Sequence, residues 1–273
     1  MKKLFFFIAA ALMAACSQPD HLTILHTNDT HSQVEPKDNN QGGYARRMGL
    51  IAKERKADKN LLLVDAGDFS QGSPYFNYFH GRVEIEAMNR MGYDAGTLGN
   101  HEFDNGLDTL AAVLKTAKFP IVCANYDFTG TCLEGIVKPY TIVHKGGLKI
   151  GIFGLGCDPK GIISDKNFEP AKYLDPYPVA QAVTDELHAQ HCDVVVCLSH
   201  MGTNGKAKED VCDCGLVHNT RGIDVIIGGH THEVHVNHYE ANLDGDSIPV
   251  CQMGKAGVNL GKIMLYLGDK NEK

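Results

Sequence analysis

The sequence predicts an α/β fold in which strands alternate with helices. A pattern that recurs five times supports this: a short apolar run, rich in β-branched residues, is followed at once by glycine, asparagine, aspartate or histidine. Such continuous apolar runs are typical of strands buried on both faces. Amphipathic stretches with helical spacing separate several of the runs, and this alternation favours a layered sheet covered by helices.

The predicted elements follow in order along one domain, which we place at residues 20–268. The strands are residues 22–25, 61–64, 95–98, 194–198 and 223–227. The helices are residues 44–56, 83–91, 107–117 and 179–190. Residues 140–154 are predicted to form a hairpin, because Lys145-Gly146-Gly147 has the composition of a tight turn. Residues 247–267 are predicted to be further strands, which suggests a second sheet.

The composition is that of an ordinary folded protein and narrows the choice of partners. The 273 residues are 43% hydrophobic and 22% charged, which excludes a collagen, a coiled coil and a disordered chain. The formal net charge of −7 makes a nucleic-acid duplex a poor partner. A phosphate-binding role would therefore need local positive charge, which a bound metal ion can supply.

The first residues read as an export signal. Lys2 and Lys3 precede an apolar run that is too short to anchor a chain across a bilayer. Residues 1–15 are thus predicted to be a signal peptide. The ending Met13-Ala14-Ala15-Cys16 resembles a bacterial lipoprotein box, with Cys16 as the lipidated residue. We expect export to the bacterial cell envelope or periplasm with a lipid anchor in the membrane; an ordinary signal peptide cleaved nearby is the alternative.

Two other groups of metal-binding residue types are interpreted as structural. Cys212 and Cys214 form a Cys-x-Cys pair, but no second ligand pair follows at zinc-finger spacing, so we expect no zinc there. His235 and His238 alternate with valines as they would in a strand, and we do not expect them to be ligands.

The polar residues that follow the five predicted strands carry the chemistry. They are Asp29 and His31 after the first, Asp68 after the second, Asn100, His101 and Asp104 after the third, His200 after the fourth, and His230 and His232 after the fifth. Loops at the carboxyl ends of parallel strands converge on one edge of a sheet. Carboxylate, amide and imidazole groups are ligands for divalent metals such as zinc or manganese. We therefore expect a metal site at this edge.

Glycines stand directly before three of these candidates. Gly67, Gly99 and Gly229 precede Asp68, Asn100 and His230. Glycine lets the backbone approach a metal or a phosphate closely, because it has no Cβ. Capping or core packing would explain any single candidate. Five consecutive strand endings with the same chemistry favour a common site.

These motifs together resemble the calcineurin-like metallophosphoesterase superfamily. The segments ILHTNDTHS, GNHEFDNG and IDVIIGGHTH are similar to its branch of 5′-nucleotidases and UDP-sugar hydrolases. The resemblance extends over residues 22–267. It implies a four-layer α/β/β/α sandwich with two divalent metal ions, zinc or manganese, with magnesium, iron and cobalt as alternatives.

The resemblance also implies a role for each candidate residue. Asp29, His31 and His232 would hold the first metal, Asn100, His200 and His230 the second, and Asp68 would bridge the two. His101 and Asp104 match a catalytic dyad that binds no metal. Two dications against two carboxylates leave a local charge of +2, which attracts phosphate. We expect a metal-bound hydroxide to attack phosphorus, while His101, oriented by Asp104, stabilises the phosphate oxygens or protonates the leaving group.

The resemblance does not extend to a substrate-specificity domain. Longer members of the branch have a C-terminal domain that grips the nucleoside, and we find no such domain here. A separate polypeptide could supply it, or the chain accepts simpler phosphoesters.

Three functions follow from these observations. The first is an exported hydrolase of 5′-nucleotides or related phosphomonoesters. The second, with the same metals, is a cyclic-nucleotide phosphodiesterase or a nucleotide-sugar pyrophosphatase. The third is a non-catalytic lipoprotein that binds partners in the envelope. The complete ligand set and His101 favour an enzyme.

Overall fold

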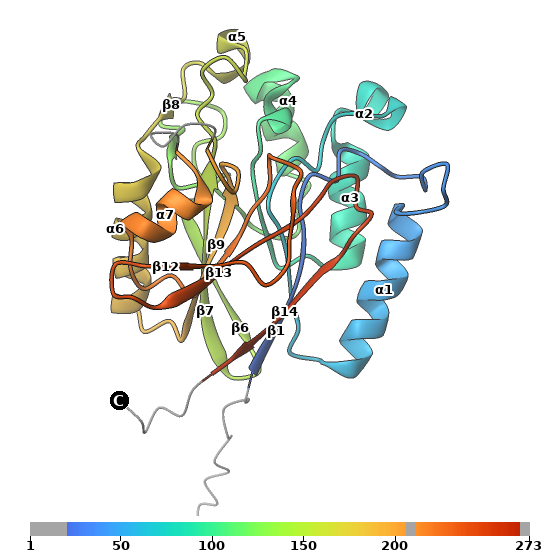
Figure 1. The fold of residues 1–273 in the computed structure, drawn as a ribbon. Coiled ribbons are helices and arrows are strands. Elements are labelled where there is room, and N and C mark those ends of the chain that lie inside the picture. Colours follow the sequence, from blue (N-terminus) through green and yellow to red (C-terminus); the bar gives the residue numbers. More distant parts are fainter. Residues whose placement is uncertain (1–20, 206–210, 268–273) are drawn as a thin grey trace, which may run out of the picture.

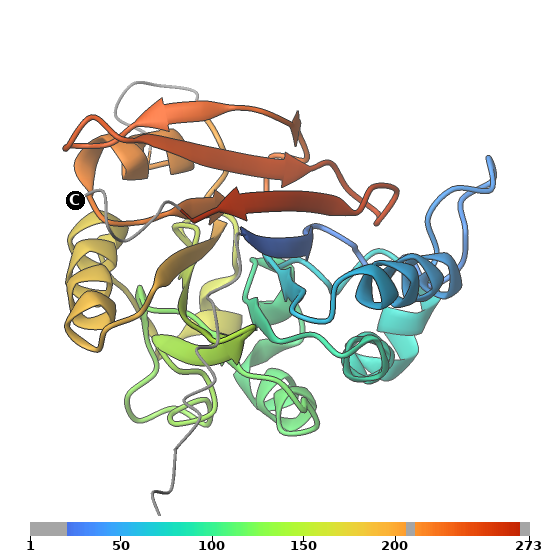
Figure 2. The same ribbon diagram turned by 90° about the horizontal axis from the view of Figure 1, so that it is seen from below.

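Two β-sheets face each other in the computed structural model, with helices on both outer sides (Figures 1 and 2). The structure describes residues 21–205 and 211–267. The predicted signal peptide and Cys16, the predicted site of lipidation, lie outside the described residues. Within these ranges no helix is both long and apolar enough to cross a membrane.

The first sheet has five strands in the order β14-β1-β2-β3-β4. The strands are β1 (His21–Thr27), β2 (Leu62–Asp65), β3 (Ala95–Thr97), β4 (Ile121–Val122) and β14 (Gly261–Tyr266). β1 to β4 run parallel, whereas β14 is antiparallel to β1. The carboxyl ends of β1, β2 and β3 therefore lie at the same edge.

The second sheet has the order β11-β13-β10-β9-β7-β6, and a seventh strand, β12, pairs with β13. Its strands are β6 (Tyr140–Lys145), β7 (Leu148–Gly156), β9 (Val194–His200), β10 (Val225–Ile227), β11 (Val234–His235), β12 (Tyr239–Ala241) and β13 (Ser247–Met253). β6 and β7 form the predicted hairpin, with Lys145 opposite Leu148 across the glycine turn. A small separate sheet pairs β5 (Tyr126–Asp127) with β8 (Lys172–Tyr173).

The helices cover the two outer faces. They are α1 (Tyr44–Ala57), α2 (Pro74–Phe79), α3 (Arg82–Met91), the 3₁₀ turn η1 (His101–Phe103), α4 (Gly106–Leu114), α5 (Asp165–Phe168), α6 (Pro176–Ala189) and α7 (Asp213–Asn219). α1, α3 and α4 pack on the first sheet, and α6 and α7 pack on the second. Figure 2 shows α1 in blue and α6 in yellow on opposite sides of the strands.

Alternation along the strands explains the four layers. In β2, Leu62 and Val64 join a core between the sheets, whereas Leu63 points to the helices outside. In β9, Val194 and Val196 face the same inter-sheet core, and Val195 faces α6 and α7. The central strands of both sheets, such as β2 and β9, are thus buried on both faces, which requires continuous apolar runs. The α/β/β/α sandwich expected from the sequence is confirmed.

The predicted elements are present with small shifts at their ends. The run at 95–98 ends as a strand one residue early, at Thr97, and the run at 223–227 begins as a strand at Val225. The short helices α2, α5 and α7 and the two-residue strands were not predicted. Elements of this length are too short for a period of 2 or 3.6 to be recognised.

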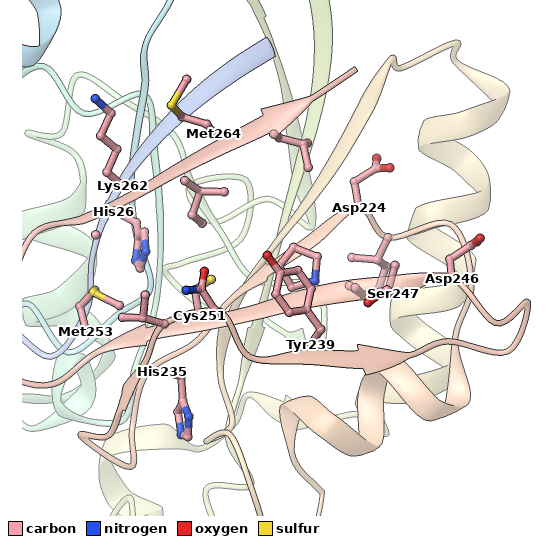
Figure 3. A pocket seen from close by; sticks show the side chains of 18 of the residues that line it. His26, Asp224, His235, Tyr239, Asp246, Ser247, Cys251, Met253, Lys262 and Met264 are labelled. Carbon is pink, nitrogen blue, oxygen red and sulfur yellow. The ribbon is translucent and has the colours of Figure 1, made fainter. Parts of the chain in front are cut away.

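A cavity of about 660 Å³ opens where β14 and the β12–β13 pair diverge (Figure 3). His26, His235 and Tyr239 are among the side chains that line it. It contains none of the residues predicted to bind metal or to act in catalysis. The cavity is therefore separate from the candidate site.

Candidate metal centre

The loops that follow β1, β2, β3 and β10, together with the last residue of β9, bring the predicted ligands together. Among the described residues, three groups of side chains have ligand atoms close enough to hold a metal ion, and two of these groups consist of predicted ligands. These two groups are Asp29, His31, Asp68 and His232, and Asp68, His200 and His230. Asp68 is common to both groups. The two sheets therefore contribute jointly to one site.

The first group surrounds the buried carboxylate of Asp29. Nε2 of His31 and Nε2 of His232 lie 3.0 Å apart. Their distances to Asp29 Oδ1 are 3.8 and 3.3 Å. His31 Nε2 also lies 4.0 Å from Asp68 Oδ2. Two imidazole nitrogens and two carboxylates thus converge on a small volume.

The second group shares Asp68 with the first. Nε2 of His200 is 3.1 Å from Asp68 Oδ2. Nδ1 of His230 is 2.9 Å from Oδ1 of Asn100, and the rings of His200 and His230 are 5.3 Å apart. Asn100 therefore lies with this group, where the family resemblance placed it.

The His200 ring is held with one nitrogen toward the cluster. Nδ1 of His200 is 2.7 Å from the carbonyl oxygen of Ala66, which leaves Nε2 facing Asp68. A backbone partner on one ring nitrogen is the usual arrangement for a metal-binding histidine, because it fixes the tautomer and the ring orientation. His200 is thus oriented as a ligand.

The charges of the cluster favour a divalent cation. Among the described residues, the ion pairs of Asp29 and Asp68 are all with histidines, and none is with lysine or arginine. Burial alone would raise the pKa of Asp68, but His200 and its neighbouring histidines hold that pKa well below the usual range. Burial lowers the pKa of His230 to about 4, so this imidazole is neutral and free to bind a metal at neutral pH. The donor set of two carboxylates, four imidazoles and an amide fits divalent metals.

Left-handed backbone is concentrated in these loops. Five of the seven candidate ligands have positive φ: Asp29, His31, Asp68, His230 and His232. Such conformations cost a non-glycine residue about 1–3 kcal/mol each and persist only where surrounding contacts impose them. Here the amide of Asp29 donates to Gly67 O at 2.9 Å and the amide of His31 donates to Asp68 O at 3.0 Å. The two loops thereby fix each other.

Two of the glycines noted in the sequence are required by close approach. A Cβ on Gly99 would lie 2.2 Å from Asp68 Oδ1, and a Cβ on Gly229 would lie 2.8 Å from His200 Nδ1. Both contacts are shorter than any side chain tolerates. Gly99 and Gly229 therefore allow the backbone to pack directly against the ligands.

His101 and Asp104 lie beside the cluster as a pair. Nδ1 of His101 is 3.0 Å from Asp104 Oδ2, and both side chains are partly exposed. The His101 ring is 5.4 Å from that of His31, and its backbone amide donates to Asp68 Oδ1 at 2.9 Å. The hydrogen bond to Asp104 raises the pKa of His101, and partial burial opposes it. His101 is thus placed to donate a proton beside the two groups of candidate metal ligands.

Glu102 is a positioning residue that sequence reasoning did not assign. Its buried carboxylate accepts the backbone amides of Asp68, Ser70 and Gly99 at 2.9, 3.0 and 2.6 Å. Burial raises its pKa to about 7, and the charge of Asp68 adds to this effect. Glu102 therefore joins the loops that carry Asp68 and Asn100. Its occurrence within the GNHEFD segment was the one available signal.

Asn28 plays a similar part for Asp29. Its amide nitrogen donates to Asp29 Oδ2 at 2.6 Å and to Gly254 O at 2.8 Å, and its oxygen accepts the amide of Met253 at 2.9 Å. The sequence showed Asn28 only as a neighbour of Asp29. Two of these partners, Met253 and Gly254, lie more than 200 residues away, so no local pattern could reveal this role.

Comparison with known proteins is consistent with this geometry. Residues 22–234 match the family model described as calcineurin-like phosphoesterase. The chain is 35% identical to the snake venom 5′-nucleotidase of Naja atra over 281 residues, which cover 92% of this chain and 51% of that protein. The chain thus spans about half the length of the curated relatives it matches.

Two solved structures are similar over most of the chain. The 5′-nucleotidase precursor from Thermus thermophilus is 33% identical with a TM-score of 0.80, and the match covers 90% of this chain and 54% of that one. The calcineurin-like phosphoesterase YfkN from Bacillus subtilis is 32% identical with a TM-score of 0.78, and the match covers 92% of this chain and 86% of that one.

Proposed function

Since this chain belongs to the calcineurin-like phosphoesterase family, we propose that it hydrolyses phosphate esters with a pair of divalent metal ions. The observation that carries the proposal is the place of Asp68 in both ligand groups. In the proposed site, Asp29, His31 and His232 hold one metal, and Asn100, His200 and His230 hold the other. Asp68 bridges them.

The metals supply the local positive charge that the acidic chain lacks. Bound divalent ions offset the charge of the phosphate and lower the pKa of a coordinated water. The protein's own part is to fix the ligands through the backbone contacts of Glu102 and Asn28, since a preorganised site requires such support. His101, held by Asp104, presents its ring to the phosphate or to the leaving group.

5′-Nucleotides are the proposed substrates. The identity to the 5′-nucleotidases of Naja atra and Thermus thermophilus supports this choice. The match covers about half of each of those chains, so nucleotide hydrolysis by this chain alone is the part of the proposal that needs a direct test.

Phosphate release from 5′-AMP is expected when the purified chain is supplied with manganese or zinc. Excess chelator should lower the rate by more than about 100-fold, because the metals provide the attacking water and the charge compensation. Release of phosphate from AMP is measured alongside turnover of a cyclic nucleotide and of a nucleotide sugar. Rates that do not respond to the chelator would contradict the metal mechanism.

The rates on the cyclic nucleotide and on the nucleotide sugar distinguish the two enzymatic functions. Faster hydrolysis of the cyclic nucleotide or nucleotide sugar than of AMP would replace the proposed monoesterase with the diesterase alternative. Activity on AMP that appears only when a nucleotidase C-terminal domain is added as a separate polypeptide would show that the chain needs a partner.

We also propose that the chain is exported and anchored by a lipid at Cys16, on the basis of residues 1–16 of the sequence. Substitution of Cys16 by serine is expected to move the protein from the membrane fraction to the soluble fraction of the cell envelope. Immunoblotting of the fractions measures the shift. A protein that stays in the membrane fraction after the substitution is not held there by this lipid.

A further inference from the structure

Strand β12 directs its side chains to two different environments. Tyr239 lines the cavity between β13 and β14 (Figure 3). Side chains alternate along an extended chain, so His238 and Glu240 lie on the other side, and neither lines that cavity. That side faces α7, which packs beside β12 (Figure 1).

A thiol, two imidazoles and a carboxylate meet between α7 and β12. Cys214 Sγ is 3.5 Å from His238 Nε2, and His238 Nε2 is 3.1 Å from Glu240 Oε1. His218 Nε2 is 2.8 Å from Glu240 Oε2. The ligand atoms of Cys214, His238 and Glu240 all lie within 4.8 Å of one another.

These separations resemble the edges of a tetrahedral zinc site. With zinc–sulfur bonds of about 2.3 Å and zinc–nitrogen bonds of about 2.0 Å, a tetrahedral ion places sulfur and nitrogen about 3.5 Å apart. Nitrogen and oxygen ligands are then about 3.3 Å apart. The Cys214–His238 and His238–Glu240 separations are 3.5 and 3.1 Å, so only small movements are needed to place a metal between the three groups.

We propose that Cys214, His238 and Glu240 bind a zinc ion that is distinct from the hydrolytic metals. The donor set of one thiolate, one imidazole and one carboxylate suits zinc rather than magnesium or calcium. The ion's two positive charges balance the thiolate and the carboxylate, so the loaded site is neutral. This proposal departs from the sequence expectation that the Cys-x-Cys segment and His238 bind no metal.

Ion pairing with His218 and His238 explains the position of Glu240. It does not explain why a buried thiol lies beside these groups. Cys214 is a buried residue. Burial first, and then the charge of Glu240, raises the pKa of Cys214 to about 12. A bound zinc ion would lower that pKa and turn the sulfur into a ligand.

The two cysteines of the Cys-x-Cys segment have different surroundings. Cys212 is the N-cap of α7, and its sulfur accepts the backbone amide of Gly215 at 3.4 Å. It belongs to none of the groups able to hold a metal among the described residues. Cys212 therefore provides a matched control for Cys214.

The zinc ion would connect two segments of the chain that lead to residues of the hydrolytic site. Asp213, next to Cys214, accepts the hydroxyl of Ser199, the neighbour of His200. His238 and Glu240 lie on the segment that follows His232. The ion would therefore hold α7 against β12 without contacting a hydrolytic ligand.

Cobalt provides a readout specific to this site, because the proposed hydrolytic ligands include no thiolate. The reduced, metal-free full chain is titrated with Co²⁺, and the near-ultraviolet sulfur-to-cobalt charge-transfer absorption is recorded. We expect the band to saturate with about one thiolate-bound cobalt per chain and to be removed by added zinc. Substitution C214S should abolish the band, whereas C212S should keep it.

Two further results test the assignment. H238A keeps the thiol and should shift the cobalt titration to higher metal concentration, which also covers the case in which C214S fails to fold. Thermal melting of each variant checks its folding. A band that survives in folded C214S, or cobalt binding by the parent chain with no such band, would overturn the proposal.

Discussion

Replacing Asp68 with asparagine is expected to lower phosphate release by more than about 10³-fold, because the bridge between the two metals is lost. Asparagine preserves the volume of the side chain and an oxygen that can accept the amide of His101, now 2.9 Å from Asp68 Oδ1. The fold should therefore survive. Metal analysis should find fewer than two ions per chain.

Asp65 supplies a matched control for this substitution. It is buried in the same segment, where it accepts the hydroxyl of Thr27 at 2.6 Å and the amide of Gly67 at 3.0 Å. It belongs to neither ligand group. Asp65→Asn retains an acceptor for Gly67, so metal content and turnover should stay near those of the parent chain. If Asp68→Asn keeps two metals and full activity, Asp68 is not the bridge.

Much of the arrangement around Asp68 was predictable because it depends on local signals. Each apolar run predicts a strand that is buried between two layers. The polar residue that follows the run therefore has to lie at the edge of the sheet. The parallel order of β1, β2 and β3 then brings Asp29, Asp68 and Asn100 together. Periodicity and turn composition were sufficient to predict this much.

The remaining features depend on contacts between distant residues. Glu102 accepts amides 32 and 34 residues away in sequence, and only its place within the GNHEFD segment distinguishes it from a surface acid. The positive φ angles of His31 and His232 arise from the way neighbouring loops brace each other. Cys214 and His238 are 24 residues apart, and their meeting depends on which way β12 and α7 face, which a two-cysteine spacing cannot reveal.

Removal of the imidazole of His101 has the second largest expected effect. His101→Ala should lower the rate on AMP by about 10²–10⁴-fold, while both metals stay bound, because His101 belongs to neither ligand group. Metal analysis and phosphate release are measured on the same preparation. His144→Ala, at an exposed position of β6, controls for loss of a histidine in general. Loss of metal from the His101 variant would show that this residue is a ligand.

The leaving group distinguishes the two roles open to His101. A nitrophenolate leaves without a proton, whereas the ribose oxygen of AMP needs one. If His101 donates that proton, His101→Ala should lower the rate on AMP far more than the rate on p-nitrophenyl phosphate. If it stabilises the phosphate oxygens, both rates should fall alike.

The dependence on pH follows from the contact between His101 and Asp104. Both roles need the protonated imidazole, so activity declines as pH rises through the pKa of His101. The hydrogen bond to Asp104, 3.0 Å long, raises that pKa. Asp104→Asn removes the negative charge and lowers the pKa, so the alkaline limb of kcat/KM should move to lower pH and the rate at neutral pH should fall. Because Asp104 acts on the predicted metal ligands only through His101, an unchanged limb would mean that a different group sets the profile, the water between the metals being the foremost alternative.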